Sequence, residues 1–219
     1  ISRNFPRPNP NDVAAFAGVP TGYAVDAMGG RGALDYRIKP LAPAASVLVG
    51  VAVTCQCGPA DNLALFAALA TAQAGDIMVA ATDGFTATSV TGDLLVGMAK
   101  NRGIRGLVTD GLVRDVAGIL AVGLPVYCAG ITANSPVRSG PGSVGLPVVL
   151  GGVTVASGDL VIGDNDGIVI VPRAEIGMVL RKLPDIRAAE AALEAKVKGG
   201  LEVPDFIQAI LDSDRVVDI

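Results

Sequence analysis

The fold is decided by the central segment 76–129, which reads DIMVAATDGFTATSVTGDLLVGMAKNRGIRGLVTDGLVRDVAGILAVGLPVYCA. Short apolar runs alternate in this segment with longer stretches of helical composition, and a polar loop follows the first run. The predicted strands are 76–81, 106–109 and 125–129, the polar loop is 83–91, and the predicted helices are 94–102 and 113–122. This alternating order predicts parallel pairing with right-handed crossovers, and therefore an α/β fold.

The flanking sequence extends the pattern in both directions. Upstream lie predicted helices at 11–16, 20–28 and 61–74 and a β-branched run at 46–55 that predicts a strand. Beyond Ser139, short strands separated by Gly- and Asp-rich turns indicate an antiparallel hairpin region. These strands are 148–150, 153–155, 160–163 and 167–171. Residues 172–198 are expected to be mostly helical with an interruption around Pro184, and residues 203–211 to form a last short helix.

No linker is long enough to separate two domains. We therefore expect a single domain over residues 1–175, followed by a C-terminal helical arm over residues 176–219. The arm has an Ala/Glu/Lys pattern with a thin apolar face. It is either a surface helix packed loosely on its own domain or an arm that reaches a neighbouring subunit.

The composition excludes several classes of function. Of 219 residues, 51% are hydrophobic and 17% are charged, with a net charge of −4, so the chain is neither disordered nor equipped with a basic surface for nucleic acid or anionic membrane. No apolar run approaches the ~18 residues of a membrane span. The absence of histidine excludes a Ser-His-Asp triad, a Cys–His pair and a His-ligated metal. Cys55, Cys57 and Cys128 are interpreted as buried apolar residues in a reducing cytoplasm, the expected location.

Two polar loops that follow predicted strands carry the candidate chemistry. The first, 91–95, reads TGDLL; its Gly–Asp turn opens a helix and leaves the backbone N–H groups of Leu94 and Leu95 free. Such a helix start suits a carboxylate or a phosphate. The alternative is that Asp93 only caps the helix.

The second loop, 109–115, reads TDGLVRD and ends in adjacent Arg114 and Asp115. An arginine can bind a carboxylate through two parallel hydrogen bonds, and an aspartate can hold a hard cation such as Mg²⁺. The alternative is a surface ion pair worth under about 1 kcal/mol. Asp93 and Arg114 are separated by 20 residues, the length of one helix plus one strand. Because successive parallel strands place their C-terminal loops side by side, we expect Asp93, Arg114 and Asp115 to share one cleft.

The pattern of Asp93, 20 residues and Arg114–Asp115 resembles the signature of class II pyruvate aldolases of the 4-hydroxy-4-methyl-2-oxoglutarate/4-carboxy-4-hydroxy-2-oxoadipate type. That family is similar in sequence and fold to the regulator of ribonuclease activity A (RraA) proteins. The resemblance covers residues 10–175 and includes further segments. These are GPADNL at 58–63, AGDIMV at 74–79, GLVTDG at 106–111, GLPVY at 123–127, and GD at 158–159 with DNDG at 164–167.

The resemblance implies a layered α/β/β/α sandwich of the swivelling-domain kind, assembled as a homotrimer or homohexamer with active sites at subunit interfaces. It implies that Asp115 holds Mg²⁺ or Mn²⁺, largely through a shell of water, and that Asp93 orients metal-bound water. Arg114 would bind the keto acid and stabilise its enolate, while the N–H groups of Leu94 and Leu95 would take the pyruvate carboxylate. The implied substrate-binding set is Gly92, Asp93, Leu94, Leu95 and Arg114.

The chemistry agrees with these roles. Retro-aldol cleavage of a 4-hydroxy-2-oxo acid needs a base for the 4-hydroxyl and an electron sink, which is either a lysine Schiff base or a divalent metal. Lys100, the lysine nearest the motif, lies on the far turn of its predicted helix, which favours the metal. Metal and Arg114 together would polarise the 2-oxo oxygen. The same sink would serve oxaloacetate decarboxylation, so we expect a metal-dependent lyase that acts on a small 2-oxo acid.

One feature of the family and two alternative functions stay open. Aldolases of the family use a glutamate from a neighbouring subunit's C-terminal arm, for which Glu190, Glu194 and Glu202 are the candidates. The main alternative function is a non-catalytic regulator of the RraA kind that binds a ribonuclease or another protein partner. A third is a metal-dependent hydratase or epimerase. The complete Asp, Arg and Asp set favours the aldolase.

Overall fold

The main sheet is built on the four parallel strands that the sequence predicts. The computed structural model describes residues 1–43 and 47–217. The parallel strands are β2 (Leu48–Cys57), β3 (Asp76–Ala81), β5 (Gly106–Thr109) and β7 (Val126–Cys128), in the spatial order β7-β5-β3-β2. β3 and β5 have the predicted bounds. Ser46, the predicted start of the first strand, lies outside the described residues.

The predicted antiparallel region is also confirmed. The hairpin of β12 (Leu160–Asp164) and β13 (Gly167–Val171) pairs antiparallel to the first half of β2. β9 (Gly142–Val144) pairs with the end of β2, and β1 (Lys39–Pro40) pairs with β7 at the opposite edge. A separate hairpin joins β10 (Val148–Leu150) to β11 (Val153–Val155).

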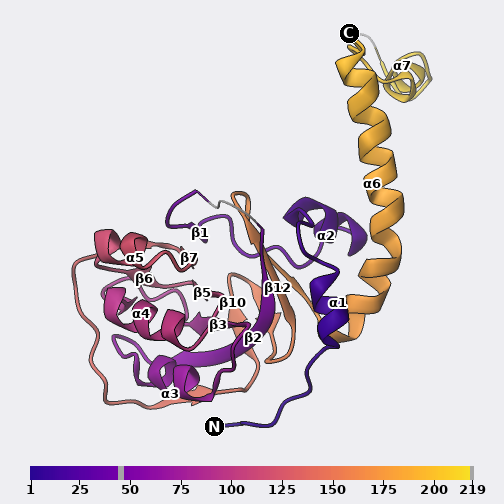
Figure 1. The fold of residues 1–219 in the computed structure, drawn as a ribbon. Helices are drawn as coiled ribbons and strands as arrows, with labels where there is room; N and C mark the ends of the chain where they lie inside the picture. The colour runs from indigo at the N-terminus through magenta and orange to yellow at the C-terminus, as the bar shows by residue number, and fades with distance from the viewer. Residues whose placement is uncertain (44–46, 218–219) are drawn as a thin grey trace.

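The helices lie on the two outer sides of these strands (Figure 1). α3 (Leu63–Thr71), α4 (Asp93–Asn101) and α5 (Val116–Val122) cover one face of the parallel strands. α1 (Pro10–Ala14), α2 (Thr21–Ala27) and the start of α6 (Ile176–Lys198) pack on the β12–β13 hairpin. The last helix is α7 (Asp205–Leu211), and a short 3₁₀ turn, η1 (Arg173–Glu175), precedes α6.

The burial pattern of the β12–β13 hairpin explains the layering. Val161 and Ile170 face inward and share a core with the parallel strands. Their neighbours Ile162 and Val169 face outward against α2 and α6. Because side chains alternate between the two faces of a strand, the hairpin is buried on both sides. The order helices, sheet, hairpin, helices is the expected layered α/β/β/α architecture, a mixed α/β domain with a helical C-terminal segment.

Three local predictions are wrong. The end of the predicted polar loop 83–91 is a strand, β4 (Ser89–Thr91), because it pairs with β6 (Leu112–Val113). Residues 113–115 do not begin a helix: β6 includes Val113 and lies between β4 and β8 (Gly130–Ile131) in a small parallel sheet. Tertiary pairing with two distant segments overrides the local helical pattern there. Helix α6 is also continuous through Pro184. The proline lies on the exposed side of the helix, where water can satisfy the carbonyl that loses its intrahelical donor.

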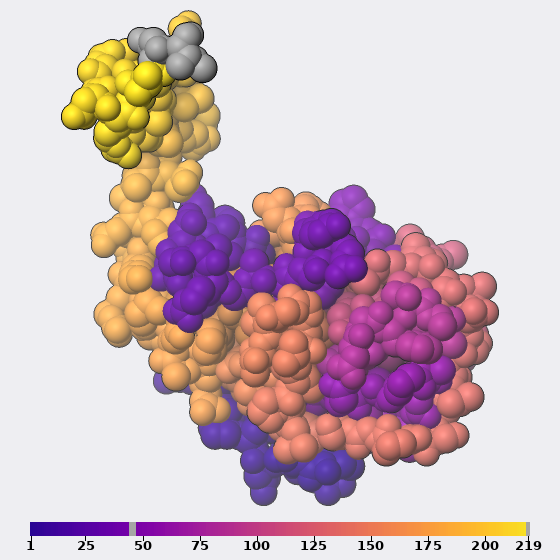
Figure 2. All heavy atoms as spheres, turned by 180° about the vertical axis from the view of Figure 1, so that it is seen from behind, coloured from indigo at the N-terminus to yellow at the C-terminus, as the bar shows by residue number. Residues whose placement is uncertain are grey.

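The C-terminal segment leaves the body of the molecule. Only the first turns of α6 are buried, through Ile176, Val179 and Leu183. Beyond them α6 projects away from the domain and carries α7 at its far end, as both the ribbon and the space-filling view show (Figures 1 and 2). In the described part of the chain, no helix has both the length and the apolar character that crossing a membrane demands.

The three cysteines follow their prediction. Cys55, Cys57 and Cys128 are buried and free, and all three belong to the core beneath α3, α4 and α5. Burial raises the pKa of the Cys128 thiol, as expected for a sulfur in apolar surroundings.

Candidate functional site

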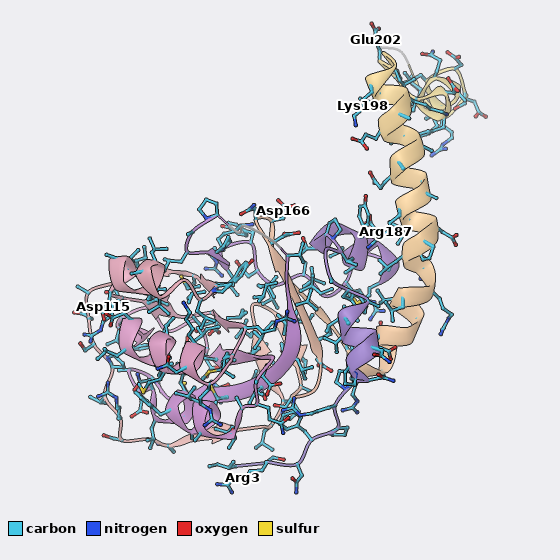
Figure 3. All side chains as sticks on the ribbon, in the orientation of Figure 1. Arg3, Asp115, Asp166, Arg187, Lys198 and Glu202 are labelled. Carbon is cyan, nitrogen blue, oxygen red and sulfur yellow. The ribbon has the colours of Figure 1, made fainter. Side chains whose placement is uncertain are left out.

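The two predicted loops meet in a single cleft. Asp93 is the first residue of α4, while Arg114 and Asp115 form the connection between β6 and α5. All three line a cleft of about 110 Å³ at the end of the domain opposite α6, where Figure 3 labels Asp115. Other residues that line the cleft are Asn62, Phe66, Thr91, Gly92, Leu94, Leu95, Met98, Pro136 and Arg138. The structure therefore brings the predicted residues together; their chemical roles stay predictions.

The small parallel sheet sets the distance between the two loops. Thr91 of β4 and Val113 of β6 are paired residues. The backbone N–H of Arg114 donates to the carbonyl of Thr91 at 3.1 Å. Each strand ends at that point, so Gly92 and Arg114 leave the sheet side by side.

Two glycines make room for the acidic side chains. A Cβ added to Gly92 would lie 2.4 Å from Oδ2 of Asp115, and one added to Gly118 would lie 2.4 Å from Oδ2 of Asp93. Neither distance is sterically possible for a real methyl group. Asp93 therefore packs across the first turn of α5, and Asp115 packs against the start of α4. Sequence reasoning missed Gly118, although a glycine inside a predicted helix is a signal of close packing.

Asp115 has a backbone conformation that aspartate adopts only occasionally. Its φ is 57° and its ψ is 43°, in the left-handed region. It occupies the N-cap position of α5, but its side chain makes no capping bond there. Instead Oδ2 lies 3.0 Å from Nε of Arg114, and the side chain is 40% exposed. The carboxylate is thus held at the mouth of the cleft rather than used to stabilise the helix.

Arg114 is held from two sides. Nε pairs with Asp115, and Nη1 donates to the hydroxyl of Ser135 in the loop that follows β8. Neither contact uses Nη2. The guanidinium is therefore oriented by the protein and retains a donor for a ligand oxygen in the cleft.

The start of α4 supplies backbone donors to the same cleft. Gly92 is the N-cap residue and no side chain caps the helix, so Asp93 is not the cap that the alternative interpretation requires. The N–H groups at the start of a helix have no intrahelical acceptor. Leu94 and Leu95 both line the cleft, so these backbone donors lie at its wall. A carboxylate bound there is also favoured by the helix dipole.

Asn62 adds a polar atom that sequence reasoning did not include among the site residues. Nδ2 donates to the carbonyl of Val90 at 3.0 Å, which fixes the amide. Oδ1 is buried and has no hydrogen-bond partner among the described residues. A buried amide oxygen without a donor is costly unless a water or ligand supplies one. Because Asn62 lines the cleft, a bound ligand can satisfy it.

The acidic side chains can hold a hard cation only with the help of water. Within residues 1–43 and 47–217, no group of three or more acidic or cysteine side chains is close enough to bind a metal. Mg²⁺, however, keeps several waters and commonly binds through one or two carboxylates. A single carboxylate at the cleft mouth, that of Asp115, fits this kind of site.

Two other predicted features lie elsewhere in the chain. Lys100 is in the last turn of α4 and donates to the carbonyl of Val122, so its amine is engaged outside the cleft. The candidate glutamates Glu190 and Glu194 lie on the projecting part of α6, and Glu202 lies beyond its end. Figure 3 shows Glu202 far from Asp115 within one chain.

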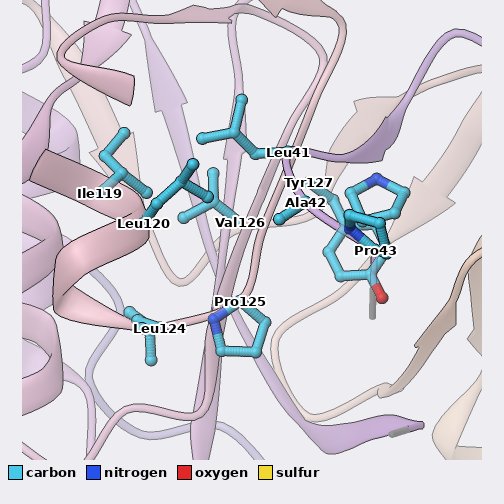
Figure 4. Close-up of a pocket in the computed structure, with 11 residues that line it drawn as sticks. Leu41, Ala42, Pro43, Ile119, Leu120, Leu124, Pro125, Val126 and Tyr127 are labelled. Atoms are coloured by element: carbon cyan, nitrogen blue, oxygen red, sulfur yellow. The ribbon is translucent and has the colours of Figure 1, made fainter. Parts of the chain in front are cut away.

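A larger cavity of about 360 Å³ is chemically different (Figure 4). Prolines and aliphatic side chains line it, among them Leu41, Ile119 and Leu124. Its one ionisable side chain is Tyr127; burial, together with the nearby charge of Asp164, raises the pKa of this phenol to about 12. It offers no charge to a 2-oxo acid, so the cleft at Arg114 is the candidate site.

Comparison with known proteins identifies the family and agrees with the fold. A family model described as RraA-like (Aldolase/RraA) matches residues 21–170. The chain belongs to this RraA-like family. A relative from Halalkalibacterium halodurans, provisionally named a 4-hydroxy-4-methyl-2-oxoglutarate aldolase, is 36% identical over 84% of this chain and 88% of its own length.

Solved structures of the RraA-like family have the same architecture. RraAS2 of Streptomyces coelicolor, described as an unusual member of the RNase ES inhibitor RraA protein family, is 30% identical with a TM-score of 0.78 over 87% of this chain and 100% of its own. The RNA-processing inhibitor RraA from Thermus thermophilis is 25% identical with a TM-score of 0.64 over 70% of this chain and 93% of its own.

Proposed function

We propose that this member of the RraA-like family is a divalent-metal-dependent lyase that cleaves 4-hydroxy-2-oxo acids to pyruvate and also decarboxylates oxaloacetate. The observation that carries the proposal is the cleft itself. It combines an oriented guanidinium, two carboxylates and the free N–H groups of a helix start. The similarity to a relative provisionally named an aldolase supports it.

The substrate is bound by its pyruvate half. Its carboxylate accepts hydrogen bonds from the backbone N–H groups of Leu94 and Leu95 at the start of α4. Its 2-oxo oxygen accepts a hydrogen bond from the guanidinium of Arg114, which Asp115 and Ser135 hold in place. The donor is oriented before the substrate arrives, so charge that develops on this oxygen is stabilised without rearrangement.

Asp115 would hold Mg²⁺ or Mn²⁺ beside Arg114, with water completing the coordination. When bound, the cation supplies Lewis-acid polarisation of the 2-oxo group. Asp93, on the facing helix, holds a water molecule and accepts the proton of the 4-hydroxyl through it. The C3–C4 bond then breaks, and its electron pair is delocalised onto the 2-oxo oxygen beside Arg114. Return of a proton to C3 gives pyruvate, and the former C4 becomes an aldehyde or ketone.

We propose a homotrimer or homohexamer in which the arm, residues 176–219, packs on a neighbouring subunit. Exposed apolar side chains support this, both on the arm, at Leu193, Val197 and Phe206, and beside the cleft, at Leu94 and Met98. Large exposed apolar groups that cluster on a surface favour association. In such an assembly one of Glu190, Glu194 and Glu202 would approach the neighbour's cleft.

Pyruvate release tests the proposed reaction. The purified protein is given 4-hydroxy-4-methyl-2-oxoglutarate or oxaloacetate with Mg²⁺, with Mn²⁺, or with a chelator, and pyruvate is followed by a coupled dehydrogenase. Turnover above that of a protein-free sample with the same metal, which the chelator stops and the metal restores, supports the proposal. No pyruvate above the protein-free level from either substrate under any of these conditions rejects it.

The second candidate is a protein-binding regulator. The relatives from Streptomyces coelicolor and Thermus thermophilis, described by their RNase or RNA-processing inhibition, favour it. A regulator that works by binding has no need for two carboxylates accommodated by glycines and a guanidinium held from both sides. Inhibition of a ribonuclease by an Arg114→Ala protein that is inactive on 2-oxo acids would separate the two functions.

A further inference from the structure

The carboxylate of Asp93 lies in the cleft without a protein partner. Among the described residues, no hydrogen bond or ion pair engages its oxygens, and it does not cap α4. The side chain is nevertheless held in place, because it packs against Gly118, where a Cβ would lie 2.4 Å from Oδ2 and 2.6 Å from Cβ of Asp93. Asp115, by contrast, pairs with Arg114. Asp93 is therefore a fixed carboxylate that is free to accept a proton.

A second unused acceptor borders the same cleft at the start of α3. Oδ1 of Asn62 is buried and has no hydrogen-bond partner in the described chain, while Nδ2 is fixed on the carbonyl of Val90. Asn62 and Asp93 both line the cleft. A water molecule has two protons to donate, and a buried acceptor is costly when it is left without a donor. A water molecule bound by Asp93 and Asn62 therefore satisfies both groups.

The side chains that line the cleft offer no nucleophile of their own for covalent catalysis. None of the described residues that line it is a lysine, a cysteine or a serine. The hydroxyl of Thr91 is buried at the end of β4, and that of nearby Ser135 accepts a hydrogen bond from Arg114. An attack on an electrophilic carbon in this cleft therefore falls to water that a general base activates.

Retro-aldol cleavage and hydrolysis of a 2,4-dioxo acid release the same leaving group. In both reactions the C3–C4 bond breaks, and its electron pair is delocalised onto the 2-oxo oxygen beside Arg114. The substrates differ only at C4, which carries a hydroxyl in one and an oxo group in the other. With a hydroxyl, Asp93 takes its proton through the intervening water. With an oxo group there is no such proton, and the same water lies next to an electrophilic carbon.

We propose that the cleft also hydrolyses 2,4-dioxo acids to pyruvate and a carboxylic acid, with Asp93 as the general base. The inference rests on the proposed function, because it uses the same anchored pyruvate half. Asp93 takes a proton from the water molecule as the water oxygen bonds to C4. The C3–C4 bond then breaks, its electron pair passes to the 2-oxo oxygen, and C4 leaves as a carboxylic acid. The enolate accepts the proton from Asp93 at C3, so one water molecule is consumed and no oxidant or reductant is needed.

The test compares two substrates that differ only at C4, 2,4-dioxopentanoate and 4-hydroxy-2-oxopentanoate. With Mg²⁺, the purified protein is expected to convert the first to acetate and pyruvate and the second to acetaldehyde and pyruvate, each above the level of a protein-free sample with the same metal. In ¹⁸O-enriched water, the acetate should gain solvent oxygen through the attack on C4. Asp93→Asn should lower kcat for hydrolysis at least about 100-fold, the lower end of what a general base contributes, and leave KM within about threefold.

A matched control removes a carboxylate elsewhere on the surface. Asp166 lies exposed in the turn between β12 and β13, and its carboxylate has no partner among the described residues. Figure 3 shows it well away from Asp115. Asp166→Asn should leave both reactions unchanged within about twofold. Circular dichroism and urea unfolding check that both variants are folded. A rate of hydrolysis in Asp93→Asn equal to that in Asp166→Asn would overturn the role of Asp93.

Exchange of the pyruvate methyl protons with deuterated water separates failure of this inference from failure of the proposed function, because the exchange reports enolate formation alone. If the wild-type protein catalyses this exchange and retro-aldol cleavage but releases no pyruvate from 2,4-dioxopentanoate above the protein-free level, the hydrolysis is overturned and the proposed function stands. Acetate without solvent oxygen would overturn the hydrolysis as well. If the wild-type protein shows neither exchange nor pyruvate release from any of these substrates, the proposed function fails and this inference fails with it.

Discussion

Replacing Gly118 by alanine tests whether the position of Asp93 matters for catalysis. The new methyl group would lie 2.4 Å from Oδ2 and 2.6 Å from Cβ of Asp93. Contact with Cβ means that the whole side chain, and not only its carboxylate, has to shift. A displacement of the order of 1 Å at a catalytic group lowers turnover about 100-fold, and this is the expected loss for Gly118→Ala.

Gly97→Ala is the matched control. Gly97 lies in α4, and a Cβ there would meet only Cγ2 of Val122, at an ordinary 3.8 Å. An alanine in a helix interior is more stable than a glycine by roughly 0.5–1 kcal/mol, so this variant should be slightly more stable and fully active. Gly118→Ala should be less stable than the control by about 1–3 kcal/mol, the usual cost of overpacking.

The assay pairs urea unfolding with pyruvate release, both at one protein concentration because any assembly makes stability depend on it. Circular dichroism checks that each variant is folded. Full activity in Gly118→Ala, equal to that of Gly97→Ala, would refute the argument that Asp93 must occupy its present place.

Four further predictions concern single side chains. Arg114→Ala should abolish turnover with little change in the unfolding midpoint, because the residue is partly exposed and lies outside the core; retained activity in steady-state assays would contradict its role. Asp115→Ala should remove activity together with the response to added Mg²⁺, and an unchanged Mg²⁺ titration would exclude this carboxylate as the ligand. Arg7→Ala should destabilise the fold by about 3 kcal/mol in urea, since it leaves the buried carboxylate of Asp76 without its two-fold hydrogen-bonded partner at 2.6 and 2.9 Å; a change below 1 kcal/mol would show that the pair contributes little. Burial opposes ionisation of Asp61, but three backbone N–H donors outweigh this effect and lower its pKa. The contribution of Asp61 to stability is therefore complete at neutral pH and is lost as the pH falls through that lowered pKa. Asp61→Asn should make the free energy of unfolding less dependent on pH in acid, and an unchanged dependence would count against this assignment.

Two central strands of the main sheet, in which every residue is buried, were predicted with their bounds. β3 (Asp76–Ala81) and β5 (Gly106–Thr109) have the predicted bounds, because a short apolar run bounded by glycine or a polar turn is typical of a strand buried on both faces of a parallel sheet. β6 (Leu112–Val113) was missed because two residues carry no periodic signal. It is a strand only through pairing with β4 and β8, which lie about 20 residues away on either side.

Part of the candidate site was likewise predictable from the sequence, and part of it was not. Asp93, Arg114 and Asp115 were predictable as neighbours because they lie in the polar segments that follow the predicted strands 76–81 and 106–109, and parallel strands end at the same edge. Asn62 and Arg138 were not, because α3 and the loop after β8 approach the cleft through contacts between distant segments, such as that of Val137 with Ala60. The spacing of residues along the chain does not reveal such long-range contacts.

The position of the cleft in the fold explains why it is exposed to solvent in a single chain. The loops do not end at the main sheet; they pair again as β4 and β6, which carries Gly92 and Arg114 outward to the molecular surface. Electrostatic stabilisation of an enolate is strongest where water is excluded, yet Leu94 at the cleft is 78% exposed in the single chain. The arm has the complementary property, since it projects away from its own domain (Figure 1) and carries exposed apolar side chains. An assembly that buries both surfaces would complete the cleft and account for a helix that contributes little to the core of the chain that carries it.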